Sequence, residues 1–184
     1  MKVHIVARKK LDTRLIQRLL PPELESQVAM FDAGGWSDSA SIARSLLVSR
    51  RNPVILVVDT NSENEAIVQQ VRQETEELLG SVSPGVPFKV VLTVPEIEWL
   101  FFARPAFLER VTGQRLDPER SVLARFKPKR VLSEILEDES PAAYERLIDD
   151  LNADDLKVLR ETAPIKELIE FVTEHSPESR LQIT

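Results

Sequence analysis

The sequence lacks cysteine, contains only two histidines, and has no apolar run close to the roughly 18 residues that a membrane-spanning helix requires. Without cysteine, a disulfide, a zinc–thiolate site and a thiol nucleophile are excluded. The two histidines are too few and too far apart to indicate a metal centre, and no Ser-His-Asp set, Walker loop or GxGxxG motif is present. The first residues lack the apolar segment and cleavage site of a signal peptide. We therefore expect a cytoplasmic protein that makes no membrane contact.

The composition is otherwise typical of a globular protein, with 42% hydrophobic and 29% charged residues. The net charge of −6 is unevenly distributed along the chain. Residues 1–58 carry nine Lys/Arg against five Asp/Glu, a net +4, and residues 59–184 carry fifteen against twenty-five, a net −10. A protein with a net negative charge does not bind nucleic acid non-specifically. A local basic patch in the first third of the chain remains compatible with these charges.

Short apolar segments alternate with amphipathic ones over the first hundred residues and predict the fold. Val54–Val58 shows no polar alternation, so both faces of that strand should be covered, as in a parallel sheet. Capping boxes are expected at Ser62–Glu65 and Thr93–Glu96. The pattern predicts an α/β fold with an open, mainly parallel four-stranded sheet. The expected strands are residues 2–7, 27–31, 54–58 and 88–94.

Parallel strands joined by right-handed crossovers end at one common edge of the sheet, and ligands bind at that edge in open α/β sheets. We call it the carboxyl edge. The loops that should meet there are residues 7–10, 32–36, 59–63 and 93–98.

From about Arg104 the pattern becomes helical and more polar, and prolines interrupt it. We divide the chain into an α/β domain, residues 1–103, and a helical extension, residues 104–184. Leucine and isoleucine stripes on the extension need a partner surface, so we expect it to pack on the sheet as one compact unit. The expected helices lie within residues 126–136, 142–151, 153–163 and 164–174.

Three stretches resemble the TOPRIM fold, and more narrowly the small bacterial TOPRIM proteins related to overcoming-lysogenization-defect nucleases. VHIVARKKLDTRLIQRLL resembles that family's first strand and helix, VILVVDTNS its strand ending in Asp-x-Asp, and VPEIEWLFFA its Glu-x-Glu helix start; FKPKRVLSEIL is similar to a later Pro-Lys helix start. The resemblance implies a first-strand glutamate that acts as general acid or base. It also implies aspartates that hold Mg²⁺ against the scissile phosphate.

The sequence departs from the family pattern at two positions. Ala7 stands where the glutamate is expected, and Asn61 stands where the second aspartate is expected. The candidate metal ligands are then Asp59, Asn61, Glu98 and Glu96, with Mg²⁺ bound weakly or not at all. The three cations that follow Ala7 lie at the first βα turn, where a helix N-terminus attracts anions. These candidate anion-binding residues are Arg8, Lys9 and Lys10.

Simpler structural roles compete with each of these interpretations. Asp59 can satisfy a turn or cap a helix, Glu96 is explained by its capping box, and the three cations can be solvated surface. Trp36 and Trp99 can stack on a base or pack in the protein. We expect a degenerate TOPRIM-like protein that binds a phosphate-bearing ligand, nucleic acid or partner protein, with a role in phage defence. The alternatives are an active Mg²⁺-dependent nuclease and a doubly wound regulatory domain unrelated to TOPRIM.

Overall fold

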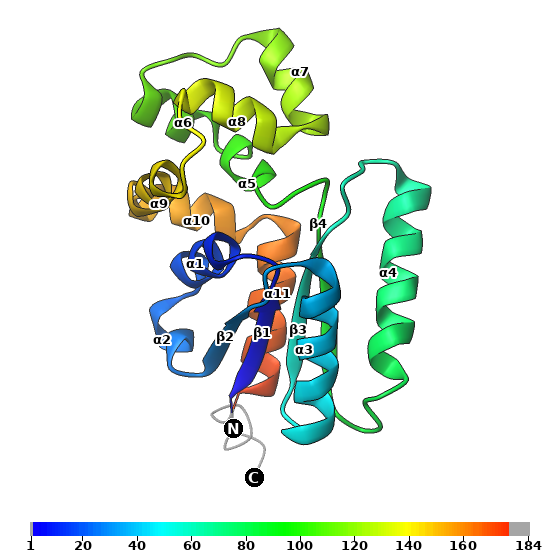
Figure 1. The fold of residues 1–184 in the computed structure, drawn as a ribbon. Helices are drawn as coiled ribbons and strands as arrows, with labels where there is room; N and C mark the ends of the chain where they lie inside the picture. Colours follow the sequence, from blue (N-terminus) through cyan, green and yellow to red (C-terminus); the bar gives the residue numbers. More distant parts are fainter. Residues whose placement is uncertain (1, 177–184) are drawn as a thin grey trace.

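The computed structural model describes residues 2–176, and over this range four parallel strands form an open sheet in the order β2-β1-β3-β4 (Figure 1). The predicted fold class, a parallel four-stranded α/β sheet with helices at the C-terminal end, is therefore confirmed. The strand order, which the sequence pattern left open, is new information. The strands are β1 (Val3–Ala7), β2 (Val28–Asp32), β3 (Val54–Asp59) and β4 (Phe88–Thr93).

Helices cover both faces of the sheet and make three layers (Figure 1). On one face lie α3 (Trp36–Ser49) and α4 (Glu65–Gly80). On the other lie α1 (Lys10–Leu19) and α11 (Ala163–His175). The remaining helices are α2 (Pro22–Glu25), α5 (Trp99–Phe102), α6 (Pro105–Thr112), α7 (Pro118–Phe126), α8 (Pro128–Leu136), α9 (Pro141–Asp149) and α10 (Ala153–Arg160).

Alternate residues of the strands supply two separate apolar cores. Ile5 and Ile55 point toward α1 and α11, whereas Val6 and Leu56 point toward α3 and α4. Because successive side chains of a strand point to opposite faces, a strand without polar alternation must be covered on both sides. This is the reason that β1 and β3, the two central strands, are buried along almost their whole length.

The connections leave the two central strands in opposite directions. The chain runs from β1 through α1 to its neighbour β2, and from β3 through α4 to its neighbour β4. The helices that follow β1 and β3 therefore lie on opposite faces of the sheet. Such a change of direction opens a crevice at the carboxyl edge, which is where open α/β sheets bind ligands. The loops after β1 and β3 flank this crevice.

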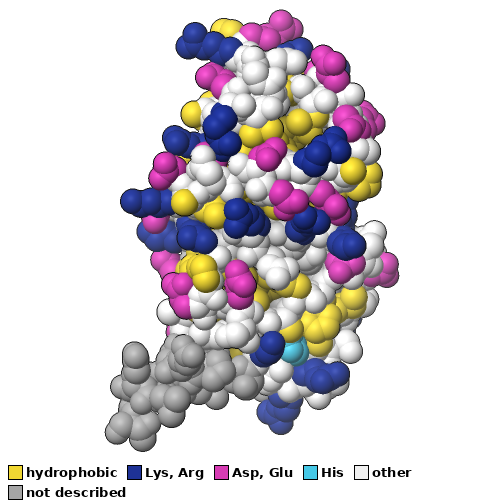
Figure 2. Space-filling model, turned by 90° about the vertical axis from the view of Figure 1, so that its left-hand side faces the viewer, with side chains coloured by type: hydrophobic (Ala, Val, Ile, Leu, Met, Phe, Trp, Pro, Cys, Tyr) yellow, Lys and Arg dark blue, Asp and Glu magenta, His cyan; other side chains and the backbone are white. Residues whose placement is uncertain are grey.

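The C-terminal helices pack on the sheet domain and share a core with it. α9 and α10 contact α1, and α11 contacts β4. One continuous apolar cluster joins Ile5 and Leu15 to Leu147, Leu159 and Leu168. On the outer face formed by α1, α2 and α9, basic and acidic side chains are interspersed (Figure 2). No helix among the described residues is both long and apolar enough to cross a membrane.

Two predicted helix starts are wrong. Helix α4 begins at Glu65, and Asn64 rather than Ser62 caps it, with its side-chain oxygen accepting from the amides of Ala66 and Ile67. The Ser62 hydroxyl instead accepts from the Asn64 amide, which makes a turn before the helix. Local hydrogen bonds of Ser and Asn compete in this way, and sequence spacing does not decide between them.

The second capping box, Thr93–Glu96, is also absent. The Thr93 hydroxyl donates to the Val58 carbonyl and to Asp59, and Glu96 accepts from the amide of Lys129 in α8. The helix that follows begins only at Trp99. Tertiary contacts across the carboxyl edge therefore use both side chains that the local pattern had assigned to a cap.

Arg160 ties the extension to the sheet domain, and its replacement by methionine is expected to lower the free energy of unfolding by about 1–2 kcal/mol. Its guanidinium donates to the carbonyls of Leu19 (2.8 Å) and Leu20 (3.0 Å) at the end of α1. Methionine keeps the apolar stem but leaves these carbonyls without that donor. Urea denaturation measures the difference, with the exposed Lys157→Met on the same helix as the control. Equal denaturation midpoints for the two variants would show that the two hydrogen bonds of Arg160 contribute nothing to stability.

Candidate functional site

Asp59, the last residue of β3, lies at the centre of the carboxyl edge. Its side chain is only 6% exposed and forms an ion pair with Arg8 at 2.7 Å. The Thr93 hydroxyl and the Ile97 amide donate to the other carboxylate oxygen, at 2.6 and 2.9 Å. Asp59 thus joins the loop after β1 to β3 and to the loop after β4. The prediction that these loops meet at one edge is confirmed.

Arg8 follows β1 and reaches across the crevice between β1 and β3. Its side chain is 28% exposed, and the carbonyl of the same residue accepts from the Gly34 amide in the loop after β2. One guanidinium nitrogen faces Asp59, whereas Nε is buried and has no hydrogen-bond partner among the described residues. A buried donor without a partner is costly in a native protein. Arg8 is therefore fixed in place and retains unused hydrogen-bonding capacity.

Asn61 lies at the surface of the same edge. Its backbone has a positive φ of 53°, a region that asparagine tolerates better than most residues. Its amide donates to the Pro95 carbonyl, and its exposed side chain donates to the carbonyl of Asp59. The identity of Asn61 is therefore explained by a turn that sets the path from β3 toward α4.

Glu98 and Glu96 follow β4 and have different surroundings. Glu96 is half-buried and accepts from the Lys129 amide at the start of α8. Glu98 is 7% exposed, and its Oε2 has no hydrogen-bond partner among the described residues. Burial, and to a smaller extent the negative charge of Asp59, raise the pKa of Glu98, although a bond from its own backbone amide and the charge of Lys9 oppose this. Glu98 is the least satisfied acid of the edge.

Asp12, which sequence reasoning missed, belongs to this group. It accepts from the Lys9 amide at the start of α1 and is 7% exposed. Burial, Asp59 and Glu98 raise the pKa of Asp12 to about 7, against the opposing charges of Lys9 and Arg8. The available signal was an acid at the third position of the first helix, where a capping carboxylate is common. Carboxyl groups with such shifted pKa values concentrate at functional sites.

The three predicted anion-binding cations do not lie in one place. Arg8 faces Asp59, the half-buried Lys9 lines a pocket beside Asp12 and Glu98, and Lys10 is exposed at the start of α1. The first βα turn therefore distributes its charges over two faces of the sheet.

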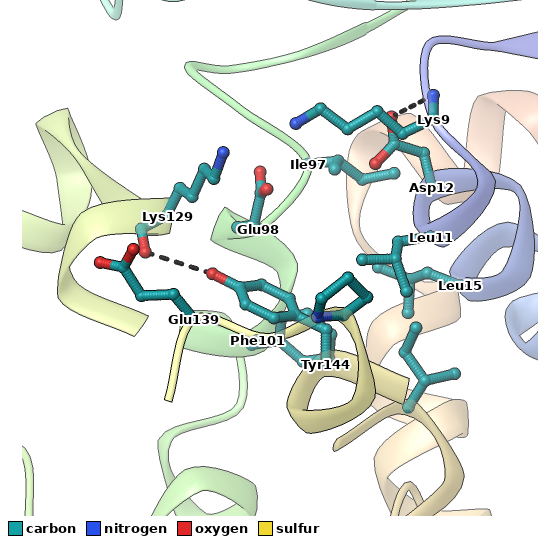
Figure 3. A pocket seen from close by; sticks show the side chains of 12 residues that line it. Lys9, Leu11, Asp12, Leu15, Ile97, Glu98, Phe101, Lys129, Glu139 and Tyr144 are labelled. Atoms are coloured by element: carbon teal, nitrogen blue, oxygen red, sulfur yellow. Dashed lines mark hydrogen bonds between the residues drawn. The ribbon is translucent and has the colours of Figure 1, made fainter. Parts of the chain in front are cut away.

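Two pockets adjoin this edge, one on each face of the sheet. The first, which we call the α3–α4 pocket, has a volume of about 430 Å³ and lies beside Arg8. The second, the α1–α9 pocket, has a volume of about 200 Å³ and is drawn in Figure 3. Polar residues of the α3–α4 pocket are Arg8, Ser39, Asp59, Thr60, Asn61, Glu74 and Thr75.

The predicted magnesium ligands fit the ion poorly in this arrangement. Mg²⁺ requires carboxylate oxygens free to point at it in octahedral geometry. Asp59 already accepts from Thr93 and Ile97 and faces Arg8, whose positive charge repels a cation. Within residues 2–176, no three His, Asp or Glu side chains gather as a metal-ion site. The metal site stays a prediction that the geometry does not favour.

Comparison with known proteins identifies no relative: no protein-family model, curated protein or solved structure matches the chain. The TOPRIM resemblance therefore rests on the sequence stretches quoted above.

Proposed function

We propose that the chain is a degenerate TOPRIM-like protein that binds a phosphate-bearing ligand in the α3–α4 pocket, without a magnesium-dependent reaction. The observation that carries this proposal is the Arg8–Asp59 ion pair. The carboxylate that would hold a metal instead orients an arginine at the topological switch of the sheet. A guanidinium with donors to spare is the group that recognises phosphate best.

The surroundings of Arg8 support an anionic ligand. The residue that caps α3 is glycine, so no cap side chain accepts a hydrogen bond from the first amides of this helix. Helix N-termini stabilise phosphate through such free amides and through the helix dipole. Trp36 begins this helix and is 44% exposed, which leaves its ring free to stack on a base. Asp38 in the same turn and Glu74 across the pocket carry the opposite charge. We therefore expect moderate, salt-dependent affinity and a preference for a mononucleotide over free phosphate.

Calorimetric titration with AMP, with inorganic phosphate as a second probe, tests the proposal. Arg8→Lys keeps a cation beside Asp59 but removes the guanidinium donors, and we expect at least roughly tenfold weaker AMP binding. The matched control is Arg44→Ala, an exposed arginine in the middle of α3, which should bind AMP unchanged. Trp36→Ala should weaken AMP binding while leaving phosphate binding unaffected.

The magnesium-dependent alternative makes an opposite prediction in the same assay. If AMP binds only when Mg²⁺ is present, or if Mg²⁺ activates cleavage of DNA that Asp59→Asn abolishes, the degenerate interpretation is wrong. If the wild type and Arg8→Lys bind AMP with equal affinity, the Arg8 guanidinium does not contribute to the site.

A further inference from the structure

The α1–α9 pocket lies on the opposite face of the sheet from the proposed phosphate site and has a different character. It is bounded by α1, by the start of α5 and by α9 (Figure 3). Its walls are largely aliphatic and aromatic, and a few polar groups converge at one end. The apolar lining residues are Leu11, Leu15, Ile97, Phe101, Pro141 and Ile148. A mostly apolar pocket with a few converging polar groups is the usual form of a small-molecule site.

Glu98 is a buried acid of this pocket that the described residues leave without a full set of hydrogen-bond partners. Its side chain lines this pocket and is more than nine-tenths buried, yet Oε2 accepts no hydrogen bond from any described residue. Asp12 lines the same pocket with equal burial, although its capping bond to the Lys9 amide occupies one of its oxygens. An unsatisfied buried acceptor costs free energy that folding alone does not recover. A donor from a ligand would remove that cost.

Two lysines flank this carboxyl group without pairing with it. In Figure 3 the ammonium groups of Lys9 and Lys129 reach toward Glu98 from opposite sides. Neither makes an ion pair of 4.0 Å or less with Glu98 in the described part of the chain, whereas the half-buried Lys89 does pair with Glu167. Tyr144 also lines the pocket, and its hydroxyl contacts the Ser133 hydroxyl and the Lys129 carbonyl. The space beside Glu98 is thus left for a group that is not supplied by the protein.

We propose that the α1–α9 pocket binds a small molecule that carries a primary ammonium group next to a branched aliphatic group. The ammonium donates to Glu98 Oε2 and to Asp12. The aliphatic group packs against Leu11, Leu15 and Phe101. A carboxylate on the same molecule, as in a branched-chain amino acid, meets the ammonium groups of Lys9 and Lys129. The proposal is independent of phosphate binding, because it uses the other face of the sheet and none of the contacts of Arg8.

Three matched probes test which groups of the ligand are recognised. Leucine carries both charges, isoamylamine lacks the carboxylate, and isocaproate lacks the ammonium. Calorimetric titration of the full chain near neutral pH should show binding of leucine and isoamylamine, with leucine tighter. Isocaproate should bind at least tenfold more weakly than leucine. If isocaproate binds as tightly as leucine, or if no probe binds, the proposal is wrong.

Two isosteric variants locate the binding group. Glu98→Gln removes the charge in nearly the same volume, and isoamylamine binding should fall at least tenfold. Glu170→Gln, an exposed glutamate of α11 that does not line this pocket, is the matched control and should leave the affinity unchanged. Each variant's thermal unfolding is recorded without ligand, so that a misfolded protein is recognised. A folded Glu98→Gln protein that binds isoamylamine like the wild type contradicts the assignment.

Discussion

Replacement of Asp59 by alanine is expected to lower the free energy of unfolding by about 3–5 kcal/mol, the usual effect of removing one partner of a buried ion pair. The carboxylate satisfies the Thr93 hydroxyl and the Ile97 amide, and it balances the charge of Arg8. Alanine leaves the Ile97 amide without this acceptor and the charge of Arg8 unbalanced, and the Thr93 hydroxyl keeps only its contact with the Val58 carbonyl. The lost stability comes more from the buried groups that lose their partner than from the attraction between Arg8 and Asp59 itself.

Urea denaturation of three variants separates this effect from a general sensitivity of the edge. Asn61→Gly, two residues along and exposed, keeps the positive φ of this turn and should cost no more than about 0.5 kcal/mol. Arg8→Met should cost less than Asp59→Ala, because Asp59 keeps its bonds from Thr93 and Ile97. The double variant should cost less than the sum of the two single variants, as expected for residues in contact. Additive costs would show that the ion pair contributes no coupling energy.

Stability is expected to fall by about 2–3 kcal/mol between about pH 5 and about pH 8, because Asp12 retains its proton in the folded protein but not in the unfolded chain. Its pKa rises from an ordinary 3.8 to about 7 on folding. The contribution to stability is therefore complete below about pH 4 and is lost as the pH rises through about 7. Glu98, whose pKa is also raised by burial, changes stability in the same direction.

Asp12→Asn isolates this contribution, because asparagine can still accept from the Lys9 amide and does not titrate. Its unfolding free energy, measured by urea denaturation at several pH values, should vary less between pH 5 and 8 than that of the wild type. The charged groups that act on Asp12 are Asp59, Glu98, Lys9 and Arg8, and all remain in this variant. An unchanged slope would show that Asp12 ionises normally in the folded protein.

The sheet and its carboxyl edge could be predicted from the sequence because their signals are local. Apolar runs such as Val54–Val58 show where strands lie, and right-handed connections bring the strand ends together. Asp59 was correctly located at that edge by the same argument. Its partner could not be identified, because the ion pair with Arg8 joins residues fifty-one positions apart and depends on β1 lying next to β3. The number of residues between Arg8 and Asp59 in the sequence does not show how close their side chains lie in the fold.

The helix caps and the buried acid Asp12 were missed for related reasons. Ser62 and Thr93 have the right spacing for capping boxes, but Asn64 and Asp59 compete for the same hydrogen bonds. Asp12 resembles an ordinary surface acid in sequence, and only the packing of α9 and α5 over α1 buries it. The pKa of a carboxyl group depends on this burial, which is a property of the assembled tertiary structure.

Asp59 links the α3–α4 pocket to the α1–α9 pocket. Asp59 lines the α3–α4 pocket, and the Ile97 amide that bonds to it belongs to the wall of the α1–α9 pocket, one residue before Glu98. The charge of Asp59 acts on both Glu98 and Asp12, and that of Arg8 acts on Asp12, so we expect a ligand that draws Arg8 away from Asp59 to change the electrostatics of the α1–α9 pocket. If both proposed ligands bind, any influence of one on the other must be equal in both directions, and each then changes the affinity of the other by the same factor.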